Sequence, residues 1–351
     1  MKIVIIGAGV AGLAIGWRLV QAGAQVTVLE RGQPGAGATA ASAGMIAVTA
    51  ELADAQVPEI EFAHYSNRLW PDFAAQIEAE SGRTIGFSRS GALILAEDAA
   101  AVSRLARQQG GVLVDVPQAR ALAPLLTGDF AGAFWAEHEA HVDSRALGSA
   151  LAIVFRKAGG KLLTNEAVVR IERDGSSPAV RTPFGLYPAD RILLAAGAWS
   201  GMIEDTPIAP VKGQMIALAP PPGLALPGPV LWGHGVYAVP RGLHLLVGAT
   251  VEEAGFDTRP TREGRDYLRA RVARLIPASK NWTLADHWAG LRPRSPDGLP
   301  LLGPSKIEGL WLAGGQYRNG ILFAPAIAQT MCDQLLDRAA PIAAFDPRRF
   351  A

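Results

Sequence analysis

The chain has 351 residues, of which 39 are glycine and 25 are proline, and 49% of it is hydrophobic. The glycines follow no collagen-like period and the hydrophobic fraction is high, so collagen-like and disordered chains are both excluded. The length exceeds what one ordinary core needs and predicts two domains, or one domain with a large insertion. The 33 basic and 32 acidic residues leave a net charge of +1, which favours neither nucleic acid nor an anionic membrane as a partner.

Cysteine usage and hydropathy narrow the class further. The single cysteine, Cys332, excludes an intramolecular disulfide and cysteine-cluster metal sites and fits a reducing compartment, so we expect a cytoplasmic protein. Residues 213–239 contain no Asp, Glu, Lys or Arg, but prolines interrupt them repeatedly, and we expect no membrane-spanning segment. The pair His138 and His141 lacks a cluster that would complete a metal site, so no metal is predicted.

The first thirty residues are typical of one strand–helix–strand unit. Residues 3–6 are a β-branched apolar run, residues 7–12 a glycine-rich turn, and residues 11–22 a helix ended by Gly23. Residues 25–30 then alternate as a second strand. Because a helix connects the two strands, we expect them to be parallel.

Residues 32–50 carry no charge and consist largely of Gly, Ala, Ser and Thr, which lets a backbone approach a ligand closely. The alternative is a flexible linker, although a linker is usually more polar.

The later elements are predicted in chain order. Between residues 58 and 195 we expect a helix at 58–80, a strand at 92–95, a helix at 99–109, a strand at 131–135, a helix from the N-cap Asp143 to about 158, and strands at 166–173 and 189–195. Beyond them we expect an antiparallel region with proline-rich turns over 207–250, a helix at 261–275, a strand ending near 293, a strand at 309–313, a glycine-bounded turn at 314–320 and a helix at 321–338.

Parallel units at both ends of the chain, with antiparallel material between them, predict an α/β fold. We expect a Rossmann-like nucleotide-binding domain that carries an inserted antiparallel-sheet (α+β) domain. The predicted segments are 1–85, 143–208 and 286–351 for the discontinuous nucleotide-binding domain, and 86–142 and 209–285 for the inserted domain.

The glycine triplet Gly7, Gly9 and Gly12 lies between the first strand and its helix, and Glu30 ends the next strand. This context is the dinucleotide fingerprint. The first glycine allows a tight turn, the second lets the backbone meet a pyrophosphate, and the third lets helix and strand pack. Glu30 would accept hydrogen bonds from the adenosine ribose. The alternative is a glycine-rich signal peptide, and the triplet alone does not separate NAD from FAD.

The 32–50 segment favours FAD, because Thr39, Ser42, Ala43, Gly44 and Met45 are suited to closing over a bulky isoalloxazine. With these residues the chain resembles the D-amino-acid oxidase/glycine oxidase superfamily of flavoproteins, and most of all the glycine oxidases. The segments that carry the resemblance run in family order over nearly the whole chain: residues 7–12, Glu30, residues 39–45, 196–201, 210–213, 237–241, 248–250, 289–293 and 315–325.

The resemblance implies non-covalently bound FAD, an FAD-binding domain and a substrate-binding domain. It assigns cofactor contacts to Gly7, Gly9, Val10, Ala11, Gly12, Glu30, Arg31, Thr39, Ser42, Ala43, Gly44, Met45, Val168, Gly197, Trp199, Gly315, Gln316, Tyr317, Arg318, Asn319, Gly320, Ile321 and Leu322. The catalytic set it implies is Arg292, Arg318, Tyr237 and Met45, with the two arginines binding a substrate carboxylate. A guanidinium suits this role because it pairs bidentately with a carboxylate, whereas the alternative is a surface salt bridge for Arg292 and a surface charge near the C-terminal strand for Arg318.

The implied activity is an FAD-dependent oxidase of small amino acids or N-substituted glycines, such as glycine, sarcosine, iminodiacetate-like amines and small D-amino acids. Hydride leaves Cα for the flavin, the imine hydrolyses to a 2-oxo acid such as glyoxylate plus ammonia or an amine, and O₂ becomes H₂O₂. Gly235 and Val251 stand where glycine oxidases can carry larger side chains, which favours a bulkier or N-substituted substrate. Cys332 lies in the last predicted helix and not on a flavin-facing loop, and the resemblance suggests a homotetramer.

Three other functions stay open at the level of sequence. A dehydrogenase would pass electrons to a quinone or a partner protein in place of O₂. An NAD(P)-dependent dehydrogenase would use the same glycine turn without a flavin. A non-catalytic flavin-binding subunit would hold FAD without being reduced by amino acids, although retention of both Arg292 and Arg318 counts against it.

Overall fold

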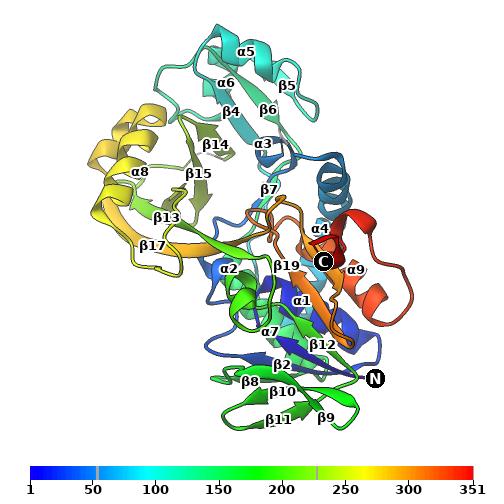
Figure 1. The fold of residues 1–351 in the computed structure, drawn as a ribbon. Helices are drawn as coiled ribbons and strands as arrows, with labels where there is room; N and C mark the ends of the chain where they lie inside the picture. The colour runs from blue at the N-terminus through cyan, green and yellow to red at the C-terminus, as the bar shows by residue number, and fades with distance from the viewer. Residues whose placement is uncertain (53–54, 227, 351) are drawn as a thin grey trace.

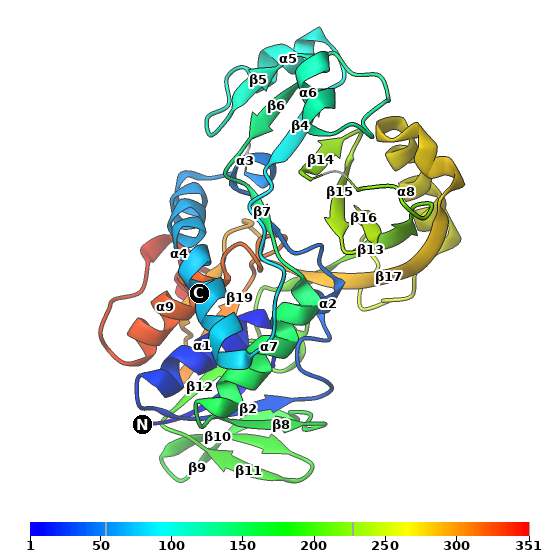
Figure 2. The ribbon, with the colours of Figure 1, turned by 180° about the vertical axis from the view of Figure 1, so that it is seen from behind.

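The computed structural model describes residues 1–52, 55–226 and 228–350. Two large β-sheets organise the chain, one in each half of the molecule as seen in Figure 1. The long strand β17 (Thr283–Arg294) belongs to one sheet and extends toward the other in both views (Figures 1 and 2). Its range spans the predicted boundary between residues 285 and 286.

The first sheet has six strands in the order β18-β19-β12-β1-β2-β8. All neighbouring pairs are parallel except β18 with β19. The strands are β1 (Lys2–Ile6), β2 (Gln25–Glu30), β8 (Lys161–Thr164), β12 (Arg191–Leu194), β18 (Leu301–Pro304) and β19 (Leu310–Gly314). The predicted parallel pairing of the first two strands is confirmed. On its other side, β1 pairs with β12, which begins only at Arg191.

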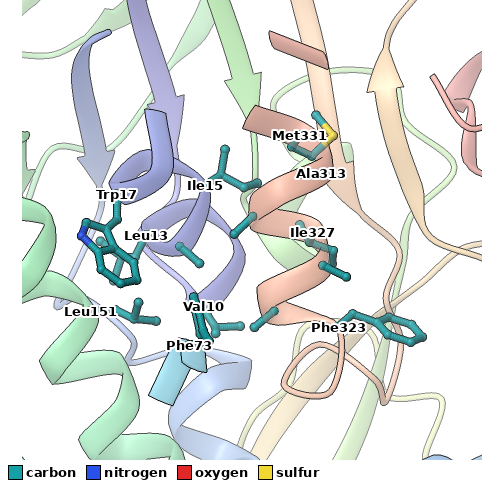
Figure 3. Close-up of a cluster of buried hydrophobic side chains, with 14 of the residues drawn as sticks. Val10, Leu13, Ile15, Trp17, Phe73, Leu151, Ala313, Phe323, Ile327 and Met331 are labelled. Atoms are coloured by element: carbon teal, nitrogen blue, oxygen red, sulfur yellow. The ribbon is translucent and has the colours of Figure 1, made fainter. Parts of the chain in front are cut away.

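This sheet is buried on both faces, which explains why its first strand is apolar without interruption. Ile3 and Ile5 pack into the core beneath the helices, whereas Val4 and Ile6 pack on the opposite face. The helices on the first face are α1 (Val10–Gln21), α4 (Val57–Ser81), α7 (Ser144–Lys157) and α9 (Ala324–Leu335). Figure 3 shows α1 beside α9, with Ile15 of α1 and Ile327 of α9 among the buried side chains, while Leu13 lies on the other side of α1 near Trp17 and Leu151.

A small antiparallel sheet covers the opposite face. It consists of β9 (Arg170–Asp174), β10 (Ser177–Thr182) and β11 (Gly185–Pro188), and Val180 and Tyr187 pack from it against Ile6 and Leu194. The one strand predicted here, at 166–173, is wrong in extent, and the sequence did not predict β10 and β11. The two strands that were not predicted, SPAVRT and GLYP, are short and contain few β-branched or aromatic residues, so they leave little strand signal in the sequence.

The second large sheet has eight strands in the order β17-β13-β16-β15-β14-β4-β6-β5. Its other members are β4 (Ala92–Ala96), β5 (Val112–Val114), β6 (Gly132–Ala136), β13 (Ala209–Ala219), β14 (Val230–Gly233), β15 (Val236–Arg241) and β16 (His244–Gly248). One face packs on α8 (Arg262–Leu275) through Leu268 and Val272. The other face presents Met215, Tyr237 and Trp288 to Ala43 and Met45 of the uncharged N-terminal segment.

The predicted helices are confirmed with shifted ends. The helix expected at 99–109 ends earlier, as α5 (Ala99–Leu105), and α6 (Val116–Leu122) was not predicted. The last helix begins at Ala324 and not at residue 321, because residues 320–323 form turns that precede it. The segment 32–50 is ordered as α2 (Ala38–Ala41), β3 (Met45–Ile46), which pairs with β7 (Ala140–His141), and most of α3 (Val48–Glu51). The described part of the chain holds no helix with the length and hydrophobicity to cross a bilayer.

Candidate active site

A cavity of about 1530 Å³ runs from the first sheet to the inner face of the second. One end is lined by the residues that follow β1, β2 and β12, such as Gly7, Arg31 and Ala196. These strands are parallel, so their carboxyl ends lie at one edge of the sheet, which is where open α/β sheets bind ligands. The other end is lined by Tyr237 and Arg292 of the eight-stranded sheet.

The glycine turn separates two kinds of glycine. Gly7 has φ +104°, and an added Cβ at Gly12 would lie 2.1 Å from the Gly7 carbonyl oxygen, so both positions are explained by packing within the turn. Gly9 has an extended backbone (φ −74°, ψ −179°) that any residue adopts, and a Cβ there would meet only Thr39 Oγ1, at 3.6 Å. Gly9 lines the cavity. Its lack of a side chain therefore fits a ligand that approaches the backbone at the start of α1.

Glu30 and Thr39 hold this turn. Glu30 accepts from the Ala8 and Gly32 amides, each at 2.8 Å, which leaves lone pairs on its carboxylate toward the cavity. Thr39 Oγ1 accepts from the Val10 amide at 3.0 Å. Arg31 stacks on the ring of Trp199 with 3.8 Å between the guanidinium carbon and the ring centroid, so these two predicted cofactor contacts lie side by side.

Arg241 of β15, a strand of the second sheet, binds the backbone of the uncharged segment 32–50. Its Nη2 donates to the carbonyls of Ala43 and Val142 at 2.7 and 2.8 Å. Gly44 fits between them because it has φ +75°, and an added Cβ would lie 1.9 Å from the Val142 oxygen. Met45 follows and lines the cavity opposite the inner face of the sheet.

Arg292 and Tyr237 form the charged end of the cavity. Arg292 Nη1 donates to the carbonyls of Lys212 and Thr250 at 3.3 and 3.1 Å. A Cβ at Gly213 would lie 2.3 Å from Arg292 Nη1, so the glycine makes room for the guanidinium across the sheet. Burial raises the pKa of Tyr237 to about 12, which keeps its phenol protonated as a donor. Among the described residues, Arg292 forms no salt bridge, in contrast to Arg318, which pairs with Glu51 at 3.7 Å.

The turn after β19 brings further predicted residues to the cavity. Residues 316–321 all line it, and Gln316 is buried with no hydrogen-bond partner for Nε2 among the residues described. Asn319 Nδ2 donates to Glu59 at 2.9 Å, and the Leu322 carbonyl accepts from Ser66 and Trp70. The turn is thus tied to α4 while its Gln316 amide stays available to a ligand.

Most of the predicted site residues are brought together and a few are not. Gly12, Gly315 and Leu322 are not among the lining residues, because Gly12 packs on the turn, Gly315 lies against Ser295 and Leu301, and Leu322 is in the helix-side core. Cys332 is buried in α9, away from the cavity. Across residues 1–52, 55–226 and 228–350, no group of three or more His, Cys, Asp or Glu is arranged to hold a metal ion.

Sequence reasoning missed Glu51, Trp232, Glu263 and Tyr267, which also line the cavity. Glu51 had one signal, since it is the first charge after the uncharged segment 32–50. Its side chain is 9% exposed, and burial raises its pKa, while Arg318 and Arg292 oppose that shift. The helix α3 that carries Glu51 is held by Glu139, which accepts from the Thr49 and Ala50 amides.

Glu139 predicts a pH dependence of stability. Burial raises its pKa from 4.5 to about 7, so the native state holds a proton that the unfolded chain releases at lower pH. The contribution of this bound proton to the free energy of unfolding is fully present below about pH 4.5. It disappears as the pH rises through 7, which lowers the free energy of unfolding by about 3 kcal/mol. The melting temperature of the wild type minus that of Glu139→Gln should therefore fall by about 4 °C between pH 4.5 and 7.5. A difference that stays constant over this range would contradict the prediction.

The residues present fit FAD on three observations. The cavity is long and continuous from the glycine turn to the second sheet, Gly9 has no packing reason to be glycine, and Gln316 offers a buried amide without a partner in the described structure. The start of α1 and Glu30 are placed to receive the pyrophosphate and ribose of a dinucleotide.

Comparison with known proteins agrees with this fit. The family model for the DAO family of FAD dependent oxidoreductases matches residues 2–334. The glycine oxidase of Pseudomonas aeruginosa is 36% identical, and the match covers 100% of this chain and 98% of that protein. The bifunctional protein ThiO/ThiG of a Synechocystis species is 37% identical over 99% of this chain, and the chain spans 54% of its length.

Solved structures give the same result. The crystal structure of glycine oxidase from Geobacillus kaustophilus superposes with a TM-score of 0.93, at 29% identity and with 98% of each chain covered. That of iminodiacetate oxidase from a Chelativorans species superposes with a TM-score of 0.89, at 28% identity and with 98% of each chain covered. The expected α/β class and FAD cofactor are confirmed, and the chain belongs to the DAO family of FAD-dependent oxidoreductases.

Proposed function

We propose that this chain oxidises small amino acids or N-substituted glycines at the amino-bearing carbon and uses O₂ as the electron acceptor. The observation that carries the proposal is the Arg292 guanidinium, which sits beside the half-buried Tyr237 phenol at the end of a cavity that begins at the dinucleotide turn. The glycine oxidase relatives and the iminodiacetate oxidase neighbour support oxidation of amino donors.

The chain's own residues bind and orient the substrate. Arg292 presents a planar pair of donors to a carboxylate, and the protonated Tyr237 adds a neutral donor at the same place. These contacts fix the Cα–H bond relative to the cofactor, which accepts the hydride when bound. Loss of the Cα hydride and of one N–H proton converts the neutral amine into an imine, which water hydrolyses to a 2-oxo acid and ammonia or a smaller amine. O₂ takes up the electron pair and two hydrogens, one from the hydride and one as H⁺, to give H₂O₂.

The cavity favours substrates larger than glycine. Gly235 and Val251 both line it, as do Trp232 and Tyr267. Gly235 has φ +77°, and an added Cβ would be 3.4 Å from the Tyr267 hydroxyl, so a larger side chain there would fill space that the glycine leaves free. An N-alkyl group or a small side chain would occupy this space.

We also propose that the chain forms two domains. Residues 1–85, 143–208 and 286–351 hold the FAD, and residues 86–142 and 209–285 form the substrate end of the cavity. The glycine turn, Glu30 and the 316–321 turn lie in the first set, and Tyr237 lies in the second. Arg292 and Arg318 belong to the first set in sequence, although Arg292 pairs through β17 with the second sheet.

The test is substrate oxidation by the purified holoprotein. We expect glycine, sarcosine and other N-alkyl glycines, or small D-amino acids, to bleach the flavin without oxygen and to release one H₂O₂ per turnover in air. If substrates bleach the flavin but little peroxide forms in air, and an artificial quinone restores turnover, the electron acceptor is not O₂. Failure of every amino acid to bleach bound flavin would overturn the proposal and favour a non-catalytic subunit.

A further inference from the structure

The substrate end of the cavity contains a carboxylate as well as two guanidinium groups. Glu51 lines it together with Arg292 and Arg318, and its Oε2 lies 3.7 Å from Arg318 Nη1. Its side chain is 9% exposed, whereas that of Arg318 is 41% exposed. The charge on Glu51 is therefore turned toward the cavity and its neighbours and away from bulk water.

The backbone that leads to Glu51 is held by hydrogen bonds. Glu51 ends α3, and the amides of Thr49 and Ala50 in that helix donate to the buried carboxyl of Glu139, with 3.0 Å for Ala50. Glu139 also belongs to the loop before β7, which pairs with β3 of the same segment. The backbone that carries Glu51 is thus fixed in the wall of the cavity, and its carboxylate is placed by the pairing with Arg318.

Two further acidic residues line this end of the cavity, but Glu252 pairs with Lys212 at 3.7 Å and Glu263 is exposed on α8, so counting the remaining charges leaves the substrate end with one cation that has no partner among the described residues. Arg318 is paired with Glu51, while Arg292 forms no salt bridge in the described part of the chain. Resting on the proposed function, we infer that Glu51 makes the site selective for substrates with one carboxylate and against those with two. A single carboxylate matches Arg292, whereas a second one would meet the Glu51 charge, and like-charge contacts of this kind are a common means of rejecting a wrong ligand.

The inference narrows the substrate class. Glycine, N-alkyl glycines and small neutral D-amino acids carry one carboxylate, which matches the one unpaired cation, Arg292. Iminodiacetate-like diacids carry two and do not match it. Arg318 then interacts with both Glu51 and the substrate carboxylate, because Glu51 partly compensates its charge before any substrate binds. Arg292 remains the main partner of the substrate carboxylate.

The test uses acetate and malonate, which carry one and two carboxylates and no amine to oxidise. Their dissociation constants are measured on the holoprotein from the change in flavin absorbance, a readout that needs no turnover. In Glu51→Gln, the ratio of the malonate to the acetate constant should fall at least tenfold relative to wild type, on the order expected for removing one like charge. The control Glu59→Gln removes a carboxylate that contacts Asn319 but does not line the cavity, and it should leave the ratio within about twofold.

Arg318→Gln is the converse variant and guards against a folding defect in Glu51→Gln. It leaves Glu51 without its partner and should raise the same ratio. An unchanged ratio in both variants would overturn the inference, as would weaker binding of glycine with no change for acetate or malonate, which would assign Glu51 to the substrate amine. If wild type bound neither anion, the carboxylate site itself, and with it the proposed function, would fail instead.

Discussion

Arg292→Ala should raise the KM for carboxylate substrates by about 30-fold or more, because removing one partner of a desolvated charge pair costs about 2–5 kcal/mol. The guanidinium is held by the Lys212 and Thr250 carbonyls across Gly213, and the nearby Arg318 is already paired with Glu51 at 3.7 Å, so it replaces Arg292 only in part. Arg292→Lys should recover only part of the loss, since an ammonium cannot make the planar two-point contact. Steady-state kinetics on glycine and sarcosine would measure both effects.

Arg294→Ala is the matched control for this prediction. Arg294 lies two residues further along β17, and its side chain pairs with Glu253 at 2.8 Å at the surface. Its loss should change KM less than twofold, as expected for an exposed ion pair. Flavin content should be equal in all three variants. An unchanged KM in Arg292→Ala would remove Arg292 from the carboxylate site.

Gly9→Val should weaken FAD binding by about 10- to 100-fold while leaving the flavin-free protein folded. The extended backbone at Gly9 accepts a β-branched residue, and the nearest protein atom to an added Cβ is Thr39 Oγ1 at 3.6 Å. The new side chain would therefore intrude only on the ligand, at the 1–3 kcal/mol that overfilling a packed space costs. Titration of the apoprotein with FAD, followed by tryptophan fluorescence, would measure the change.

Gly12→Ala provides the contrast, because its Cβ would lie 2.1 Å from the Gly7 carbonyl oxygen. This clash is within the protein, so we expect the melting temperature of the apoprotein to fall in Gly12→Ala and to stay within about 1 °C of wild type in Gly9→Val. Equal losses of stability in the two variants would contradict the assignment of Gly9 to the ligand.

Local patterns in the sequence predicted the cofactor end of the site. The glycine triplet, the acid that ends the second strand and the uncharged 32–50 segment each depend on residues close in the chain. A turn with φ +104° at Gly7 and a close backbone approach at Gly12 can be met only by glycine, so these constraints are visible without the fold. For the same reason, the strand–helix–strand opening was predicted with bounds within a residue or two.

Patterns failed where an element depends on distant partners. The three-stranded sheet at 170–188 is polar along one face and owes its place to Val180 and Tyr187 covering the first sheet. The last helix begins at Ala324 because the preceding turn is anchored to Ser66 and Trp70 of α4, which residues 314–323 alone do not reveal.

By itself, the sequence determined the class of cofactor and the parallel nucleotide-binding unit, since each leaves a signature in neighbouring residues, while Arg292 as the carboxylate partner is an expectation from the family resemblance. Only the tertiary structure decided the charge balance of the site. Glu51 and Arg318 come from opposite ends of the chain, and their 3.7 Å pairing arises where α3 and the turn after β19 meet the second sheet. Electrostatic selectivity depends on distance through space, and spacing along the chain carries no record of it.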